Sequence, residues 1–216
     1  MKINKYHLYF FGCILFSLGA SFFISSNLGT NPLDVFTTGI RKQYGIMIGT
    51  TQSLFAILCL LLWSFIYKFK RIPPLSTFLT FFLCGYLIDF FLFLTNETTP
   101  LNSWIELIIG LLFCTQASAL IIMSGFGIRA MDLVAIALVD KTGLPFWIYK
   151  GIAEVILFSS GYILGGEFGI GTIAFLFFVG WMIQPFIIIN EKFGIPNYGP
   201  VNNFEKLNKE QIKLKQ

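Results

Sequence analysis

The sequence predicts an all-α membrane protein, with six transmembrane helices arranged as two inverted three-helix repeats. Three observations lead to this fold class: an apolar composition, six apolar segments of spanning length, and a motif that occurs twice. Of the 216 residues, 56% are hydrophobic and only 12% are charged, and the mean hydropathy is +0.75. These values lie far outside the range of ordinary soluble domains, so we expect an integral membrane protein.

Six segments are apolar and long enough to cross a hydrocarbon core of about 30 Å, which takes roughly 20 helical residues. Their approximate bounds are 7–26, 48–67, 75–94, 104–124, 146–164 and 171–189. The first segment ends near Gly19-Ala20-Ser21, which resembles the cleavage site of a signal peptide. Its counterpart at 104–124 is internal, so we expect the first segment to belong to the folded domain.

The repeated motif occurs once in each half of the chain. Residues 28–34 read LGTNPLD and residues 126–132 read FGIRAMD. The two copies are 98 positions apart, the difference between 29 and 127. The matched positions are Gly29 with Gly127, Asp34 with Asp132, Gly45 with Gly143 and, after a shift of three residues in the connecting loop, Thr77 with Thr172 and Gly85 with Gly180. The chain is therefore an internal duplication, and each half is one structural repeat.

A short helix is predicted after the first span of each repeat, at 32–44 and at 130–142. Gly29 and Pro32 break the chain before the first of these helices, and Gly127 breaks it before the second. Each helix has an Asp in its first turn and a glycine at its end, as capped helices do. About a dozen residues reach only some 18 Å, which is too short to span. These helices either dip partway into the membrane or lie on its surface.

The basic residues decide the topology. Six crossings with a cytoplasmic amino terminus place Lys68, Lys70, Arg71 and the lysines of the tail inside, and leave only Arg41 and Lys42 outside. Because three spans per repeat is an odd number, the second repeat enters the membrane from the opposite side. We therefore assign residues 1–95 to the first repeat, 96–191 to the second, and 192–216 to a polar cytoplasmic tail, in the plasma membrane.

Inverted repeats with interrupted helices are typical of secondary transporters, which bind their substrate near the midplane between the repeats. We therefore expect a transporter of a small polar or organic solute, working by alternating access. The alternative is a membrane accessory or sensor protein that acts through helix contacts with a partner. An enzyme is not expected, because no motif of a known intramembrane hydrolase or acyl transferase is present.

The expected partners are the lipid bilayer and a small solute, without nucleic acid, and a homodimer is left open. No cofactor and no metal ion are expected. The cysteines occur singly, without the spacing of a zinc site or a disulfide framework, and the one histidine, His7, lies at the first membrane boundary.

The fifth predicted span contains the clearest departure from the symmetry of the repeats. Lys150 and Glu154 lie four residues apart on one helix face, where the first repeat has the uncharged Gln52 and Ala56. A charged side chain near the middle of the bilayer costs roughly 2.5 to 3.5 kcal/mol on insertion scales, so Glu154 should face the interior. It is either a proton- or cation-coupling carboxylate or one half of a structural ion pair with Lys150.

The remaining candidates have both a structural and a functional interpretation. Asp34 and Asp132 serve either as helix caps alone or also as parts of a site. Asp89 and Gln184 occupy equivalent places in the third and sixth spans, and for these two, as for Gln116, we favour hydrogen bonds between packed helices. The candidate solute or ion pathway therefore comprises Glu154, Lys150, Asp34, Asp132, Gln52, Asp89 and Gln184.

Several of these residues also carry a resemblance to a known group of proteins. The motifs are residues 28–34 followed by 45–50, residues 127–132, Lys150 with Glu154, and residues 165–172, which read GGEFGIGT. With them, the chain resembles the YczE-like branch of the YczE/YyaS/YitT group of bacterial integral membrane proteins. The resemblance covers nearly the whole membrane domain. It implies a bacterial membrane protein from a group whose function is largely uncharacterised.

Overall fold

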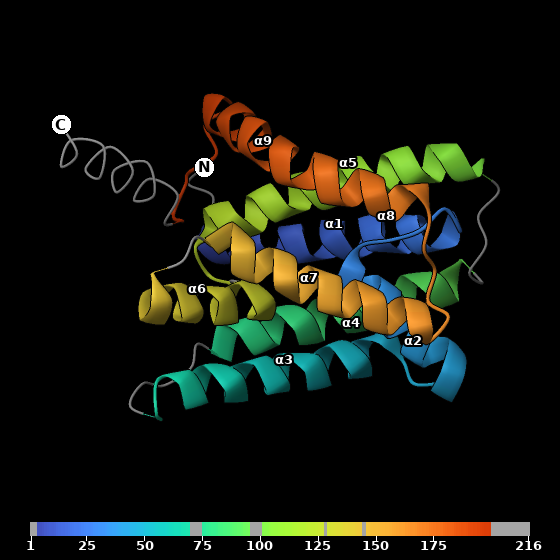
Figure 1. Cartoon of the computed structure of the whole chain (residues 1–216). Helices are drawn as coiled ribbons and strands as arrows, with labels where there is room; N and C mark the ends of the chain where they lie inside the picture. The colour runs from blue at the N-terminus through green and yellow to red at the C-terminus, as the bar shows by residue number, and fades with distance from the viewer. Residues whose placement is uncertain (1–3, 70–74, 96–100, 128, 144–145, 200–216) are drawn as a thin grey trace.

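The computed structural model describes residues 4–69, 75–95, 101–127, 129–143 and 146–199, and within these ranges it contains helices and no strand (Figure 1). The helices are α1 (Lys5–Ser25), α2 (Pro32–Tyr44), α3 (Ile48–Ile66), α4 (Leu75–Leu94), α5 (Ser103–Ser124), α6 (Ala130–Thr142), α7 (Phe146–Ile163), α8 (Ile170–Ala174) and α9 (Gly180–Lys192). A single π-helical turn, Phe175–Val179, joins α8 to α9.

Four of these helices, α1, α3, α4 and α5, are long and apolar enough to cross a membrane. The segment from α8 to α9 adds a fifth candidate span if its two parts, which meet at an angle of 53°, cross as one. In α7 the described apolar stretch, Gly151–Ile163, is shorter than a span. The fold is thus that of a membrane-embedded helical protein with four to five candidate spans, and six spans in inverted repeats stay a prediction.

The last predicted span, 171–189, is not one straight helix. The chain forms α8, then the π-helical turn, then α9, which contains Pro185. A π-helical turn inserts an extra residue into the hydrogen-bond ladder, and sharp kinks in helices arise at such turns. The bend at Gly180 therefore follows from the irregular backbone before it.

The short helices α2 and α6 occupy the two segments that the sequence predicts for them. Asn31 caps α2, and its side-chain oxygen accepts a hydrogen bond from the Asp34 amide at 3.0 Å. The ends are set by Gly45 and Gly143, whose φ angles of 69° and 74° are left-handed and suit glycine. Each helix ends there because the left-handed backbone of the glycine turns the chain away from the helix axis.

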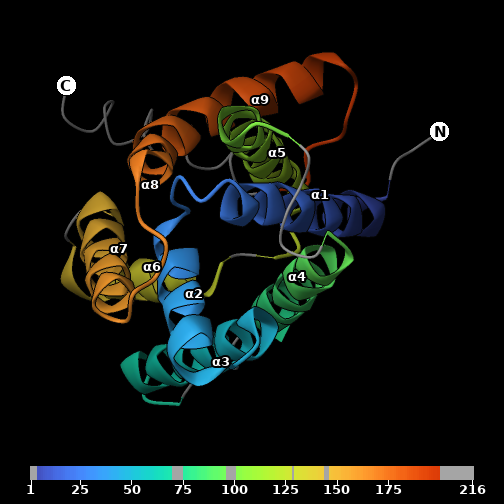
Figure 2. The ribbon, with the colours of Figure 1, turned by 90° about the vertical axis from the view of Figure 1, so that its right-hand side faces the viewer.

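Glycines let the main helix pairs approach closely. The pair α1 and α5 makes the most extensive helix contact, with α4 against α1 and α9 against α5 (Figure 2). A Cβ atom added to Gly110 of α5 would lie 2.5 Å from the Phe23 ring and 2.9 Å from the Gly19 carbonyl of α1. Small residues at such contacts are the usual means of packing helices in a membrane, where burial of apolar surface supplies little driving force.

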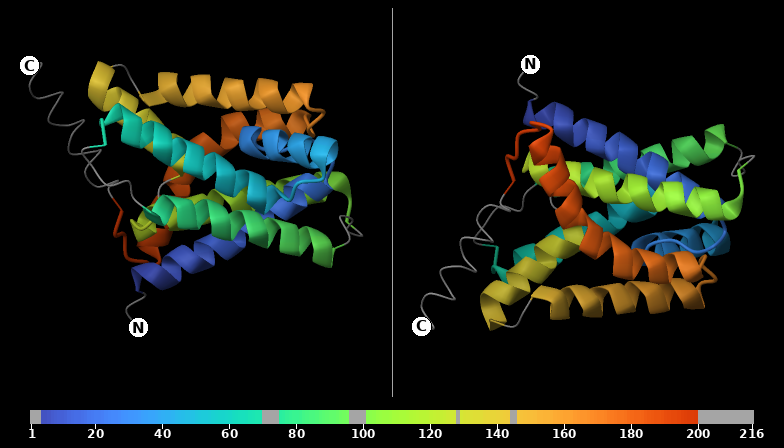
Figure 3. Two further views of the ribbon diagram at one scale, coloured as in Figure 1. Left: turned by 90° about the horizontal axis from the view of Figure 1, so that it is seen from below. Right: turned by 90° about the horizontal axis from the view of Figure 1, so that it is seen from above.

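The short helices lie between α3 and α7 and pack on both. α2 packs mainly on α7, whereas α6 packs on both α3 and α7. Figure 3 shows α2 and α6 at opposite ends of the bundle. Each short helix therefore contacts a long helix from the other half of the chain, α2 through α7 and α6 through α3.

Candidate functional site

The first turn of α2 holds a fully buried carboxyl group. Asp34 is 0% exposed, and its side chain accepts hydrogen bonds from the amides of Asn31 and Gln52, the latter at 3.0 Å. The Thr30 hydroxyl is also fully buried beside this carboxyl and makes no hydrogen bond of normal geometry. The Asp34 amide donates to the Asn31 side-chain oxygen and the Asn31 side-chain amide donates to the Asp34 carboxylate, so the helix cap and the polar cluster are the same residues.

Burial raises the pKa of Asp34 to about 7, although the hydrogen bonds from Asn31 and Gln52 favour the charged form and oppose this shift. The helix that carries Asp34 is too short to span a membrane. A carboxyl group with this pKa exchanges its proton near neutral pH, which is the property that a proton-coupled site requires.

The first turn of α6 comes to the same place. Ala130, its first residue, is fully buried in a cluster with Ala56, Cys59 and Phe81 from the middle of α3 and α4. Leu33, the second residue of α2, packs against this cluster. The amino-terminal ends of the two short helices therefore meet beside the midpoint of α3.

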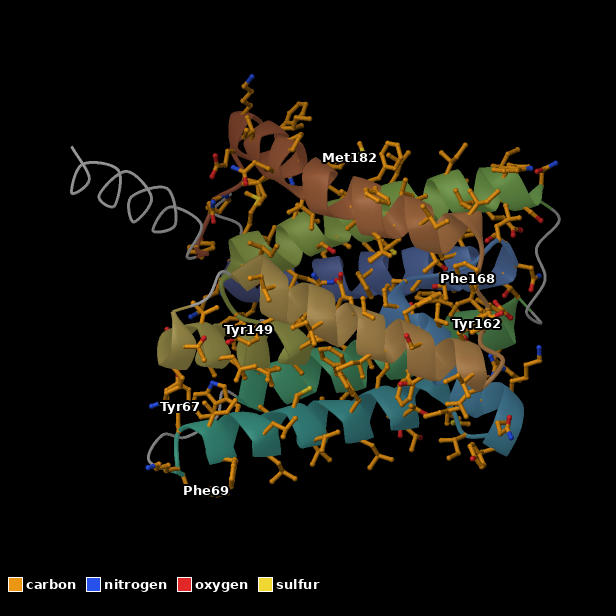
Figure 4. The ribbon with its side chains drawn as sticks, viewed as in Figure 1. Tyr67, Phe69, Tyr149, Tyr162, Phe168 and Met182 are labelled. Carbon is orange, nitrogen blue, oxygen red and sulfur yellow. The ribbon has the colours of Figure 1, made fainter. Side chains whose placement is uncertain are left out.

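The carboxyl-terminal ends of the short helices lie at opposite ends of the molecule. α2 ends at Tyr44, which is exposed and precedes the start of α3. α6 ends beside the far end of α3, where the Tyr67 hydroxyl donates to Asp140 at 2.6 Å, and beside the start of α7, where the Tyr149 hydroxyl donates to Thr142 at 2.6 Å. Figure 4 labels Tyr67 and Tyr149 at this end, and Tyr162 and Phe168 at the other.

Two groups of opposite charge approach the centre from these helices. Arg129 occupies the N-cap position of α6, and Asp34 lies in the first turn of α2. The Cys114 thiol, buried at the middle of α5, is within electrostatic range of both. The positive ends of two helix dipoles, one carboxyl group and one guanidinium group are thus gathered around the middle of the bundle.

Four of the predicted pathway residues are not joined to the Asp34 cluster by a described contact. Glu154 lies half-buried on α7. The side chains of Lys150 and Asp132 lie outside the described residues, so the predicted pair of Lys150 with Glu154 stays a prediction. Gln184, in α9, is exposed.

Asp89 and Gln116 make hydrogen bonds between helices. The Asp89 carboxylate accepts bonds from the amides of Ile48 and Gly49, at 3.1 Å and 2.7 Å, and so caps the start of α3 from α4. Because Gln52 lies in the next turn of α3, this cap fixes the helix from which Gln52 reaches Asp34. Gln116 of α5 exchanges two hydrogen bonds with Asn190 of α9, at 2.9 Å and 3.2 Å.

The sequence named Asp34 as a candidate but did not pair it with its hydrogen-bond partners. Gln52 drew attention only as the counterpart of Lys150, and Asn31 not at all. Asn31 carries a signal that could have found it, because Asn followed three residues later by an acidic residue is typical of a capped helix start. No local signal connects Gln52 to Asp34, because the contact joins two helices.

A family model covers almost all of the described helices, matching residues 3–188. The chain belongs to the family of unknown function DUF6198. It is 27% identical over 192 residues to the uncharacterized protein YyaS of Bacillus subtilis, covering 87% of this chain and 94% of that one. It is also 25% identical over 184 residues to an uncharacterized protein of Haemophilus influenzae, covering 83% and 81%. No solved structure matches the chain.

These comparisons support a YyaS-like family and do not single out the YczE-like branch. Neither relative carries a name that states an activity, so the functional argument for this DUF6198 member rests on its own residues.

Proposed function

We propose that this protein is a secondary transporter of a small polar or organic solute, in which two inverted repeats of three spans alternate around a central site. In this proposal it lies in the plasma membrane with both termini in the cytoplasm. The observation that supports it best is the meeting of the α2 and α6 amino termini beside the middle of α3, with their other ends at opposite ends of the bundle.

This arrangement matches what a re-entrant helix requires. Non-helical backbone at membrane depth is tolerated only where protein buries it or where it lines a cavity. The turn before α2 meets this condition, since Thr30 and Asn31 are both buried. Two half-helices whose positive ends meet near the midplane are a recurrent way for transporters to hold a polar solute.

The proposal gives Asp34 the coupling role that the sequence alone gave to Glu154. Asp34 is fully buried, its hydrogen-bond donors are neutral amides, and it sits at the meeting point, whereas Glu154 is half-buried on α7. When Asp34 is ionised, Asn31 and Gln52 both donate to it. When Asp34 is protonated, its hydrogen bonds with Asn31 and Gln52 weaken, and α2 is held less firmly against α3.

Each short helix packs on a long helix from the other half of the chain, so a change at Asp34 can affect the rest of the protein. α2 belongs to the first repeat but packs on α7 of the second. A Cβ atom on Gly161 would lie 2.5 Å from the Phe36 amide nitrogen, so the two backbones are in direct contact. If α2 moves together with α7 of the second repeat, the contact between Asp34 on α2 and Gln52 on α3 changes.

The experiment is uptake of a panel of solutes into proteoliposomes under an imposed pH gradient. The wild type is compared with Asp34→Asn, Glu154→Gln and the matched control Asp140→Asn, which alters an exposed carboxylate. We expect flux in the wild type and the control, and its loss in Asp34→Asn with folding preserved. Wild-type flux that survives in Asp34→Asn would contradict the coupling role, and absence of flux for all solutes would contradict transport.

One observation favours the alternative, a non-transporting accessory or sensor protein. The turn before α2 is packed tightly against the loop after α7, and a Cβ atom on Gly169 would lie 2.3 Å from the Leu28 carbonyl oxygen. In that alternative the polar cluster only holds the helices together, and a partner protein binds an outer face. Copurification of one stoichiometric membrane partner, together with absence of flux, would favour it.

A further inference from the structure

We propose that the turn before α2 binds a sodium ion, held by the Asp34 carboxylate and the Thr30 and Thr172 hydroxyls. A role for this ion in coupling transport rests on the proposed function. The existence of the binding site is argued only from the contacts around the turn, and it is tested separately from transport.

The first observation is a pair of buried hydroxyl groups. Thr30 is 0% exposed and Thr172 is 1% exposed. The Thr172 hydroxyl makes no hydrogen bond within the described part of the chain, and the Thr30 hydroxyl lies beside the Asp34 carboxyl without a hydrogen bond of normal geometry. Buried hydroxyls nearly always have a partner, because leaving one unpaired costs the free energy of its lost hydration. Two such oxygens at one turn indicate that a ligand pairs with them.

The second observation is that these oxygens belong to one site. Gly29 adopts a φ of 101°, and a Cβ atom there would lie 2.7 Å from the Thr172 hydroxyl oxygen. The amide of Gly171 donates to the Leu28 carbonyl at 2.7 Å, which fixes the start of α8 against the turn. Thr30 follows Gly29 directly and lies beside the Asp34 carboxyl.

The third observation is the charge of the site. The groups that contact the Asp34 carboxyl, which are Asn31, Gln52 and Thr30, are all neutral, and Arg129 is not one of them, so a monovalent cation would balance its charge at this depth. Carboxylate and hydroxyl oxygens are hard ligands, which suit an alkali ion rather than a transition metal.

The corresponding turn before α6 does not offer this set. The sequence has Ile128 where the first turn has Thr30, and Arg129 where it has Asn31. The guanidinium of Arg129, at the N-cap of α6, would repel a cation. Thr77, the counterpart of Thr172, is likewise buried without a hydrogen bond in the described residues, and it supplies a matched control.

A proton and a sodium ion would both neutralise the Asp34 carboxylate, so the two compete for this site. The other titratable or charged groups around it are the Cys84 and Cys114 thiols, which lie within electrostatic range, Arg129 at the N-cap of α6, Glu167 in the packed loop, and Glu154 two turns before Gly161 on α7. Sodium binding should therefore weaken in acidic buffer.

The test is thermal unfolding of the purified full-length protein in detergent, in slightly alkaline buffer, with NaCl or with choline chloride at equal ionic strength. For a protein of this size, sodium at about 100 times its Kd should raise Tm by roughly 5 to 10 °C. Thr172→Val, which keeps the shape and removes the oxygen, should abolish the sodium-dependent rise without lowering Tm in choline. Thr77→Val should keep the full rise.

Three results would overturn the proposal: equal Tm of the wild type in sodium and choline, a sodium-dependent rise that survives in Thr172→Val, or a rise given by Ca²⁺ and not by Na⁺. Should Thr172→Val fold poorly, proteolysis of the wild type replaces this variant: sodium should slow cleavage at the turn before α2, and an equal rate in sodium and choline would contradict the site. A sodium-dependent rise without any solute flux would keep the site and contradict only the proposed transport.

Discussion

Gly161 is the position where one added methyl group tests the contact between the two halves most sharply. In Gly161→Ala, the new Cβ would lie 2.5 Å from the Phe36 amide nitrogen and 2.6 Å from the Val35 carbonyl carbon, whereas ordinary contacts are 3.4–4 Å. The α2 backbone must therefore move by about 1 Å, since a backbone cannot rotate away as a side chain can. Overpacking of this kind costs about 1 to 3 kcal/mol.

The same helix provides the matched control. Gly151 lies ten residues earlier on α7, and a Cβ atom there would meet nothing within 4 Å. Replacing a helical glycine by alanine stabilises a helix by roughly 0.5 to 1 kcal/mol. Gly151→Ala should therefore raise the stability slightly, whereas Gly161→Ala should lower it by about 1 to 2 kcal/mol after the same gain is included.

The assay is thermal unfolding in detergent at one fixed scan rate, followed by tryptophan fluorescence. A difference of about 2 to 3 kcal/mol between the two variants corresponds to roughly 4 to 12 °C in Tm for a chain of this length. If Gly161→Ala melts at or above the temperature of Gly151→Ala, the described packing of α2 on α7 between the two halves of the chain is refuted.

Three further predictions concern polar groups. Without sodium, Tm should fall as the pH rises from 5 through about 7, because the buried Asp34 favours the protonated form. The loss of unfolding free energy is at most about 4 kcal/mol for three pKa units. Asp34→Asn should remove this slope, and an unchanged slope would refute its assignment to Asp34. Asp89→Asn should cost about 1 to 2 kcal/mol in thermal unfolding, because the α3 amides lose a charged cap; an unaltered Tm would show that the cap is unimportant. Gln116→Leu should cost about 1 to 3 kcal/mol by leaving Asn190 unpaired, and Leu at both positions should recover most of it; equal losses in the single and double variants would argue against the pair.

Much of the local structure follows from the sequence because local chemistry specifies it. Gly45 and Gly143 end the short helices through their left-handed backbone, and an apolar stretch of about 20 residues has few alternatives to a spanning helix. The exceptions are 171–189, where neither Gly180 nor Pro185 alone predicts a π-helical turn, and 146–164, where the described apolar stretch is shorter than a span.

The arrangement of the helices could not be predicted in the same way. A membrane helix is apolar on all sides, so its sequence does not mark the face that meets a neighbour. The packing of α2 on α7 depends on Gly161, and the contact of Gln52 with Asp34 depends on how α3 is placed by Asp89. Such contacts join distant parts of the chain and carry no periodic signal.

The central claim is that the two short helices enter the membrane from opposite sides. It is tested most directly by labelling single cysteines with a thiol reagent that does not cross membranes, in a variant in which Cys13, Cys59, Cys84 and Cys114 are replaced. Tyr44→Cys reports the end of α2, and Lys141→Cys reports the end of α6; both positions are exposed. We predict that intact cells label only Tyr44→Cys and that inside-out vesicles label only Lys141→Cys. Labelling of both positions from the same side would contradict the inverted arrangement and, with it, the proposed transport cycle.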